Sequence, residues 1–423
     1  MTEVTTSPGN KATSGAAVLM QLLGKTKLYW GLAALIVFGA LTSPLSSKGN
    51  NIFLSLGNLT DILRQVSVTG IVAVGMTLVI FIAGIDLSVG SIMALGTVIC
   101  AMLLTQQGWT AASMFSIPAS GVVLCVAVAA LLYFVQVQMR RSKSASGSGA
   151  PSKMPALVVG AVLSFAVMLW MVTQVEGKFG VMAVLVAVPC VGIVMGSLNG
   201  VLIVYGRLQP FIVTLAMMVG ALGLARVIAG QDTAVYPVYT GSNAVQEFDV
   251  LRSLLWGVVP VPGLFFLAVL ALFYVLTRFT TFGSYLLAIG GNTEAARLAG
   301  INVKRNTIVT YAIAGGLSAL AGILYVAQFR QGKPDAGLGL ELDAIAAVVI
   351  GGTSLMGGRG AILGTFVGVL IFGFLSNILQ LNNIDSNTQL ILKGVIIVAA
   401  VLLQEGRVED FLSAAKRKMR GEK

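Results

Sequence analysis

The sequence predicts an all-α membrane protein, a bundle of about twelve transmembrane helices. Three observations lead to this fold class. Of the 423 residues, 57% are hydrophobic and only 10% are charged, and the mean hydropathy is +0.92, far above the usage of soluble proteins. Apolar runs of spanning length recur along the chain between short polar segments. Basic residues gather in alternate connecting segments, as the positive-inside rule requires of a multi-pass protein.

Composition also excludes several function classes. The chain has no histidine, which removes a His-based catalytic triad and a His-ligated zinc site. The three cysteines Cys100, Cys125 and Cys190 lie in apolar runs, where small buried hydrophobes are expected. Lys25 follows a glycine, but Leu19 stands where a phosphate-binding loop needs its first glycine. We therefore expect that the chain is no enzyme and has no metal, no cofactor and no ATP site of its own.

The net charge of +11 is spread through short loops between apolar runs. This distribution is typical of membrane orientation, and we expect no nucleic-acid partner.

The first part of the chain supplies three predicted spans. Residues 1–27 are polar and predict a disordered cytoplasmic tail, and the first span follows at 28–42. Residues 45–60 form a predicted outer loop. A second span at about 62–83 runs directly into the sequence GIDLSVGS at 84–91 and a third span that ends near Leu104.

Asp86 lies between two apolar runs without a polar buffer. A charge at mid-membrane costs on the order of 3 kcal/mol, so its side chain should face protein or water. Two interpretations stay open. Asp86 either caps the third helix by accepting the amide hydrogens near Ser88 and Val89, or it lines a transport pathway together with Ser88.

Residues 106–180 contain two apolar runs, 117–138 and 155–173, on either side of a Ser/Gly linker. The linker carries Arg140, Arg141, Lys143 and Lys153 and no acidic residue, which places its tip in the cytoplasm. The segment is a predicted inserted helical hairpin, and the sequence assigns it no function.

Further spans are predicted along the rest of the chain, at about 181–205, 210–229, 263–277, 307–327, 341–356, 361–381 and 389–403. The transmembrane domain thus covers 28–404, with both termini in the cytoplasm. The basic tail 405–423 suits an anionic inner leaflet of membrane lipid.

Residues 283–305 form a polar island in the apolar second half of the chain. After Gly290 and Gly291, either Asn292 or Thr293 can cap a short helix through residues 294–298, and Gly300 can supply the left-handed residue that ends it. From the residues alone, this helix is either a solvated connector or a surface that another protein binds.

Three stretches carry a resemblance to a known family: GGNTEAARLAGIN at 290–302, GIDLSVGS at 84–91 and ELDAIAAVVIGGTSLMGG at 341–358. Together they resemble the permease subunits of bacterial sugar ABC importers of the ribose, galactose and xylose type, in a superfamily that also holds branched-chain amino acid permeases. The resemblance covers roughly 50–105 and 180–405.

The resemblance implies a set of partners and a location. It makes 278–306 a cytoplasmic coupling loop in which Glu294, Ala295, Ala296 and Gly300 meet an ABC ATPase subunit. It also implies a periplasmic solute-binding protein, a homodimer or a related second permease, and a bacterial inner (plasma) membrane location.

Removing the inserted hairpin leaves about ten spans, and an odd number in each half would relate the halves by inversion in the membrane. The spacing from Asp86 to Asn199 matches that from Asp343 to Asn377 once about 75 residues are removed, although chance can produce such a match. The candidate pathway residues are therefore Asp86, Ser88, Asn199, Asp343 and Asn377.

The glycine-rich segments 83–96 and 337–360 should permit close helix packing or a re-entrant turn. Nearby, Glu341 and Asp343 can form a buried ion pair with Lys393, because both segments begin at the outer side.

Two rivals come from other classes. An ion-coupled secondary transporter would also need intramembrane acids, but it would work without ATP. A membrane enzyme would need a nucleophile and base facing water, and the sequence contains no such set. Within the family, the cargo could be a branched-chain amino acid or another small solute instead of a sugar.

Overall fold

The structure is a computed structural model that describes residues 27–142, 154–230 and 235–404. The predicted tails 1–27 and 405–423 therefore lie almost wholly outside the described residues, as does the tip of the inserted linker. The described chain is mostly helical, and its predicted class, a helical membrane protein, is confirmed.

The helices are α2 (Lys27–Thr42), α3 (Leu56–Phe81), α4 (Val89–Thr105), α5 (Ala111–Ser142), α6 (Met154–Thr173), α7 (Val181–Tyr205), α8 (Pro210–Ala229), α9 (Val261–Phe279), α10 (Thr281–Gly291), α11 (Thr293–Leu298), α12 (Val303–Phe329), α13 (Leu340–Ile350), α14 (Ile362–Leu381) and α15 (Ser386–Gln404). Within the described ranges, 8 helices are long and apolar enough to cross a membrane, and α2 and α4 are shorter apolar helices. The exact count of twelve crossings stays a prediction.

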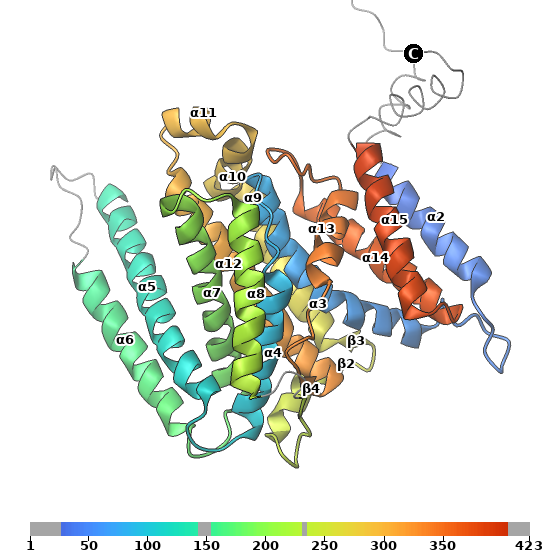
Figure 1. Ribbon diagram of the computed structural model, residues 1–423, viewed down its shortest axis with the longest axis horizontal. Helices are drawn as coiled ribbons and strands as arrows, with labels where there is room; N and C mark the ends of the chain where they lie inside the picture. Colours follow the sequence, from blue (N-terminus) through green and yellow to red (C-terminus); the bar gives the residue numbers. More distant parts are fainter. Residues whose placement is uncertain (1–26, 143–153, 231–234, 405–423) are drawn as a thin grey trace, which may run out of the picture.

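Short elements lie toward the end of the molecule opposite α10 and α11 (Figure 1). They are the strands β1 (Tyr236–Pro237), β2 (Leu254–Leu255), β3 (Val259–Pro260) and β4 (Gln331–Gly332), and the 3₁₀ helix η1 (Gln246–Arg252). The strands pair β1 with β4 and β2 with β3, both antiparallel.

Helix α12 lies in the centre of the bundle and packs against α7, α4 and α3. Its contact with α7 depends on Gly192, Gly196 and Gly200, which recur every fourth residue on one face of α7. A Cβ at Gly196 would overlap the carbonyl oxygen of Tyr311, and one at Gly200 would lie 2.6 Å from the Cα of Ile308. Only glycine lets these two backbones approach so closely, because small residues at a membrane helix interface remove the side-chain layer between them.

Helix α3 begins six residues before its predicted start at 62. The Ser55 hydroxyl caps it by accepting the backbone N–H of Asn58 at 3.3 Å. Helix α10 was not predicted, and Thr280 caps it by accepting the N–H of Phe282 at 3.2 Å. Both errors have the same origin, because a single Ser or Thr cap in a mixed segment gives little sequence signal.

The prediction of a span at 341–356 is wrong as a continuous helix. Helix α13 has 11 residues, which is about 16 Å at 1.5 Å per residue, or roughly half of the hydrocarbon thickness. The backbone of Gly351 lies against that of Gly364 on α14, and Gly352 and Gly357 have positive φ. The chain therefore turns through 351–361 and continues as α14, and the close helix packing predicted for this glycine-rich segment is confirmed by the contact between Gly351 and Gly364.

Helices α5 and α6 form an antiparallel hairpin at one edge of the bundle (Figure 1). Helix α6 packs mainly against α5, where Gly160 lies next to the backbone of Cys125 and Ala129. Most other α6 side chains are exposed. The helices of the predicted hairpin are confirmed, and its origin as an insertion stays a prediction.

Replacing Gly196 by alanine tests the contact between α7 and α12. The added methyl group would overlap the Tyr311 carbonyl, so we expect the free energy of unfolding to fall by about 1–3 kcal/mol. Gly220→Ala on α8 is the matched control, because its Cβ would meet no atom within 4 Å. Thermal unfolding of both purified variants in detergent measures the effect, and equal midpoints would contradict the proposed packing.

Candidate functional site

A buried polar cluster lies where α3 ends and α4 begins. Asp86 is fully buried, and its Oδ1 accepts the backbone N–H of Ser88 at 2.9 Å and the Ser88 hydroxyl at 2.6 Å. The Ser88 oxygen in turn accepts a hydrogen bond from Asn199 Nδ2 of α7 at 2.9 Å. The structure thus brings three predicted pathway residues together. Asp86 accepts the Ser88 amide as expected, but Ser88 is itself the N-cap residue of α4 and no side-chain capping hydrogen bond is present there.

This cluster is incompletely paired. Among the described residues, Asp86 Oδ2, Asn199 Oδ1 and the Tyr311 hydroxyl are buried without a hydrogen-bond partner. Tyr311 lies on α12, fully buried, and a Cβ at Gly84 would lie 2.6 Å from its hydroxyl oxygen. Sequence reasoning missed Tyr311, whose only signal is a phenol within an apolar run. Since Asp86, Ser88 and Asn199 are all unexposed, these side chains line no open pathway in this conformation.

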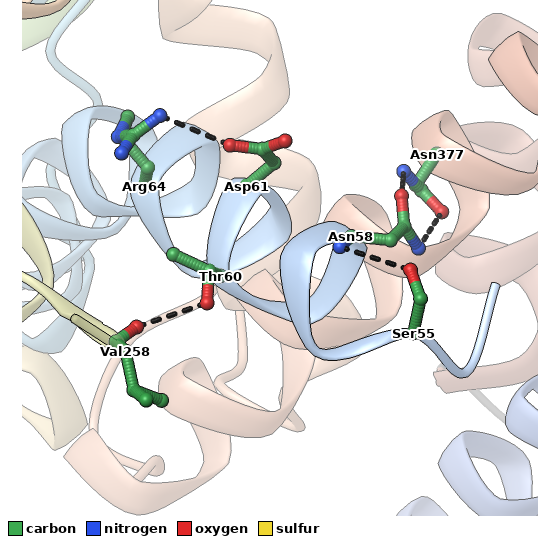
Figure 2. A network of polar contacts seen from close by, with 7 residues as sticks. All are labelled: Ser55, Asn58, Thr60, Asp61, Arg64, Val258 and Asn377. Carbon is green, nitrogen blue, oxygen red and sulfur yellow. Dashed lines mark hydrogen bonds and ion pairs between the residues drawn. The ribbon is translucent and has the colours of Figure 1, made fainter. Parts of the chain in front are cut away.

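The other two predicted pathway residues lie elsewhere. Asn377 of α14 exchanges two hydrogen bonds with Asn58 of α3, at 2.7 and 3.0 Å (Figure 2). Asp343 of α13 pairs with Lys393 of α15 instead. Asp343 and Asn377 therefore make no contact with each other, unlike Asp86 and Asn199, which are joined through Ser88.

The predicted ion pair is present for one of its two acids. Lys393 Nζ lies 2.7 Å from Asp343 Oδ2, and the two side chains are 20% and 27% exposed. Glu341 forms no ion pair within the described parts of the chain, and its carboxylate lies against Gly90 at the start of α4. The ion pair joins the short helix α13 to α15.

The predicted coupling helix is present as α11. The Asn292 side chain accepts the N–H of Ala295 at 2.9 Å, and Gly300 ends the turn with φ of +83°. Glu294, Ala295 and Gly300 are exposed, whereas Ala296 points inward. Glu294 is paired with Arg297 at 2.8 Å, an exposed pair that contributes little stability. Leu298 is 80% exposed, so α11 presents a free surface with an apolar residue at its end.

Helix α11 is connected to the bundle through α10. The Gly358 N–H donates to the Phe81 carbonyl at the end of α3, at 3.1 Å. A Cβ at Gly290, the penultimate residue of α10, would overlap that carbonyl and lie 2.6 Å from the Gly358 nitrogen. The end of α10, the end of α3 and the turn 351–361 thus meet through backbone atoms, immediately before α11.

Further polar contacts lie around the first turns of α3 (Figure 2). Asp61 and Arg64 form an ion pair at 3.0 Å. The Thr60 hydroxyl donates to the Val258 carbonyl at 2.9 Å, which ties α3 to the turn between β2 and β3. These contacts hold one wall of the large cavity described below.

A glycine-packed bundle of membrane helices with an exposed, capped helix at one end is the architecture of a multi-pass membrane protein. The chain belongs to the family described as branched-chain amino acid transport system / permease component, whose sequence profile matches residues 58–150 and 152–401. The resemblance noted from the three sequence stretches is thereby confirmed.

Several relatives are similar over most of the chain. The ribose import permease protein of Escherichia coli (strain K12) is 38% identical over 380 residues, covering 88% of this chain and 92% of that protein. The ribose import permease protein of Bacillus subtilis (strain 168) is 34% identical over 385 residues, covering 91% and 93%. The xylose transport system permease protein of Haemophilus influenzae (strain ATCC 51907 / DSM 11121 / KW20 / Rd) is 31% identical over 382 residues, covering 87% and 94%. No solved structure matches the chain significantly.

Replacing Ser88 by alanine tests the buried cluster. The change removes a donor from Asp86 and an acceptor from Asn199, and each buried group left unpaired costs about 1–3 kcal/mol. Ser116→Ala on α5 is the matched control, because the Ser116 hydroxyl is buried and has no hydrogen-bond partner among the described residues. We expect a lower unfolding midpoint for Ser88→Ala alone, and the same midpoint for both variants would show that the cluster adds no stability.

Proposed function

We propose that this chain is the permease subunit of an ATP-driven importer that moves a sugar across the bacterial inner membrane. Three relatives named above, two ribose permeases and one xylose permease, support sugar as the cargo class. The family description, which names branched-chain amino acids, keeps such a solute as the second candidate. The rival enzyme and secondary-transporter classes gain no support from the relatives.

The observation that carries the proposal is the surface of α11 and its backbone contacts with the bundle. A separate ATPase subunit binds α11, and its ATP-driven movement displaces the end of α10. Because Gly290 and Gly358 leave no side chain in between, α3 and the turn 351–361 follow as near-rigid parts. A second permease subunit, a periplasmic solute-binding protein and the surrounding lipid complete the assembly.

The proposal fixes the orientation of the bundle. The end that holds α11 carries Arg278, Arg297, Lys304 and Arg305 and faces the cytoplasm. Both termini lie on that side if the chain makes about twelve crossings, with the segment 331–361 crossing as a short helix plus extended chain. Within this domain, 106–180 is the inserted hairpin and 278–306 is the coupling loop.

Single cysteines at two exposed positions test this orientation in the chain with its native cysteines replaced. Leu298→Cys on α11 should react with a membrane-impermeant maleimide only after the cells are opened. Ser242→Cys, in an exposed turn at the opposite end, should react in cells whose outer membrane alone is permeabilised. Reaction of Leu298→Cys in those cells would show that α11 faces the periplasm, where it could not bind the ATPase subunit, and the proposed orientation would be wrong.

Gly300→Val tests the coupling role of α11. Valine at φ of +83° strains the backbone by about 1 kcal/mol or more and displaces the helix end. We expect sugar uptake and transport-stimulated ATP hydrolysis to fall together in reconstituted importer, and Glu294→Lys to lower both as well.

The matched control is Gly49→Val, at a turn residue with φ of +78° and equally open space. It carries the same backbone strain away from α11 and should leave both activities unchanged. Normal uptake in Gly300→Val and Glu294→Lys would make α11 a solvated connector.

A further inference from the structure

A large cavity with both charged and apolar lining residues opens at the end of the protein opposite α11. Its volume is about 1180 Å³, and it lies between α3, η1, β2, the start of α9 and the last turn of α12. Helix α12 begins soon after α11 and has 27 residues, so its last turn is about 40 Å from its first. In the proposed orientation the cavity opens to the periplasm.

Charges of both signs line this cavity in near balance. Asp61 and Arg64 come from α3, and Glu247, Asp249 and Arg252 come from η1. Three carboxylates and two guanidinium groups thus line the cavity, together with four glutamine side chains. Such a lining offers many hydrogen bonds and little net field, which suits a neutral solute with several hydroxyl groups.

Two polar atoms in the cavity wall lack a protein partner. Arg64 Nε and Gln328 Oε1 are buried and make no hydrogen bond within the described part of the chain. Arg64 is held in place by its 3.0 Å contact with Asp61 (Figure 2). One atom is a donor and the other an acceptor, and a hydroxyl group can serve either, because it both accepts and donates.

An aromatic ring lies beside these polar groups. Phe329 follows Gln328 on α12, lines the cavity and is 49% exposed. Its ring is held by Tyr325, with centroids 4.4 Å apart. Apolar surface next to a few fixed polar groups is typical of small-molecule sites, and the C–H face of a sugar ring fits such a surface.

We propose that this cavity is a binding site for a neutral monosaccharide on its way from the binding protein into the bundle. The inference rests on the proposed function and adds where the permease itself holds its cargo. Arg64, Arg252 and Gln328 hydrogen-bond the hydroxyl groups, and Phe329 packs against the ring.

The test uses the whole importer in liposomes, with the chain, its ATPase subunit and its binding protein. Uptake of radiolabelled D-ribose, D-xylose, D-galactose and L-leucine by the wild type identifies the transported probe. Gln328→Leu keeps the side-chain size but removes the acceptor, and Arg252→Gln removes a donor on a separate element. We expect each to lower uptake of that probe about tenfold, while ATP hydrolysis stimulated by the loaded binding protein stays within about twofold of the wild type.

Glu176→Gln is the control, because Glu176 is exposed in the turn between α6 and α7 and lies outside the cavity lining. It should leave uptake and hydrolysis unchanged. The proposed site is supported if the number of sugar molecules transported per ATP hydrolysed falls in both cavity variants and does not fall in the control.

Three results would overturn the inference. Wild-type uptake in both cavity variants would place the transport path elsewhere. A parallel loss of uptake and of stimulated hydrolysis would make the cavity wall a docking surface for the binding protein. Transport of L-leucine and of no sugar by the wild type would instead overturn the proposed function itself, so the two failures are distinguishable.

Discussion

The direct approach of helix backbones at glycine is the contact on which the rest of the structure depends. Helix α12 contacts α7 through Gly192, Gly196 and Gly200, and it contacts α4 through Gly322, whose Cβ would lie 2.7 Å from the Met93 carbonyl oxygen. In a membrane no hydrophobic force drives one apolar helix against another, so close packing and polar contacts must hold the bundle. Side chains as small as alanine would separate α12 from its neighbours and open the core at its centre.

The same constraint explains what the sequence could and could not predict. Local signals worked: the Asn292 cap, the left-handed Gly300 and the Ser88 contact of Asp86 all lie within a few residues of the groups they serve. The Asp343 and Lys393 pair followed from matching depths in the membrane. In contrast, Asn58 and Asn377 are 319 positions apart, and neither sequence segment contains a pattern that predicts the contact between them. The early end of α13 also depends on a distant residue, because the carbonyl of Gly351 lies against Gly364.

Two cavities lie at opposite ends of α12. The large one ends at Gln328 and Phe329, and a smaller one of about 270 Å³ reaches Thr307 and Tyr311 near α11. Between them the helix is largely buried. This buried middle part of α12 is a barrier between the two cavities, and the incompletely paired cluster around Tyr311 lies at its inner end.

The position of that cluster connects the barrier with α11. Gly84 lies against the Tyr311 hydroxyl, and the neighbouring residue Ala83 lies against Gly357 of the turn 351–361. That turn contacts the end of α10 through Gly358, and α11 follows directly. These are contacts between backbone atoms, so side-chain rotation cannot absorb a shift of α11. Such a shift therefore reaches the turn that follows α3. Buried polar groups that lack partners in this conformation cost stability, and a second arrangement in which the Tyr311 hydroxyl donates to Asp86 Oδ2 or to Asn199 Oδ1 would lower that cost. The cluster is thus a part of the barrier in which a conformational change can add a hydrogen bond.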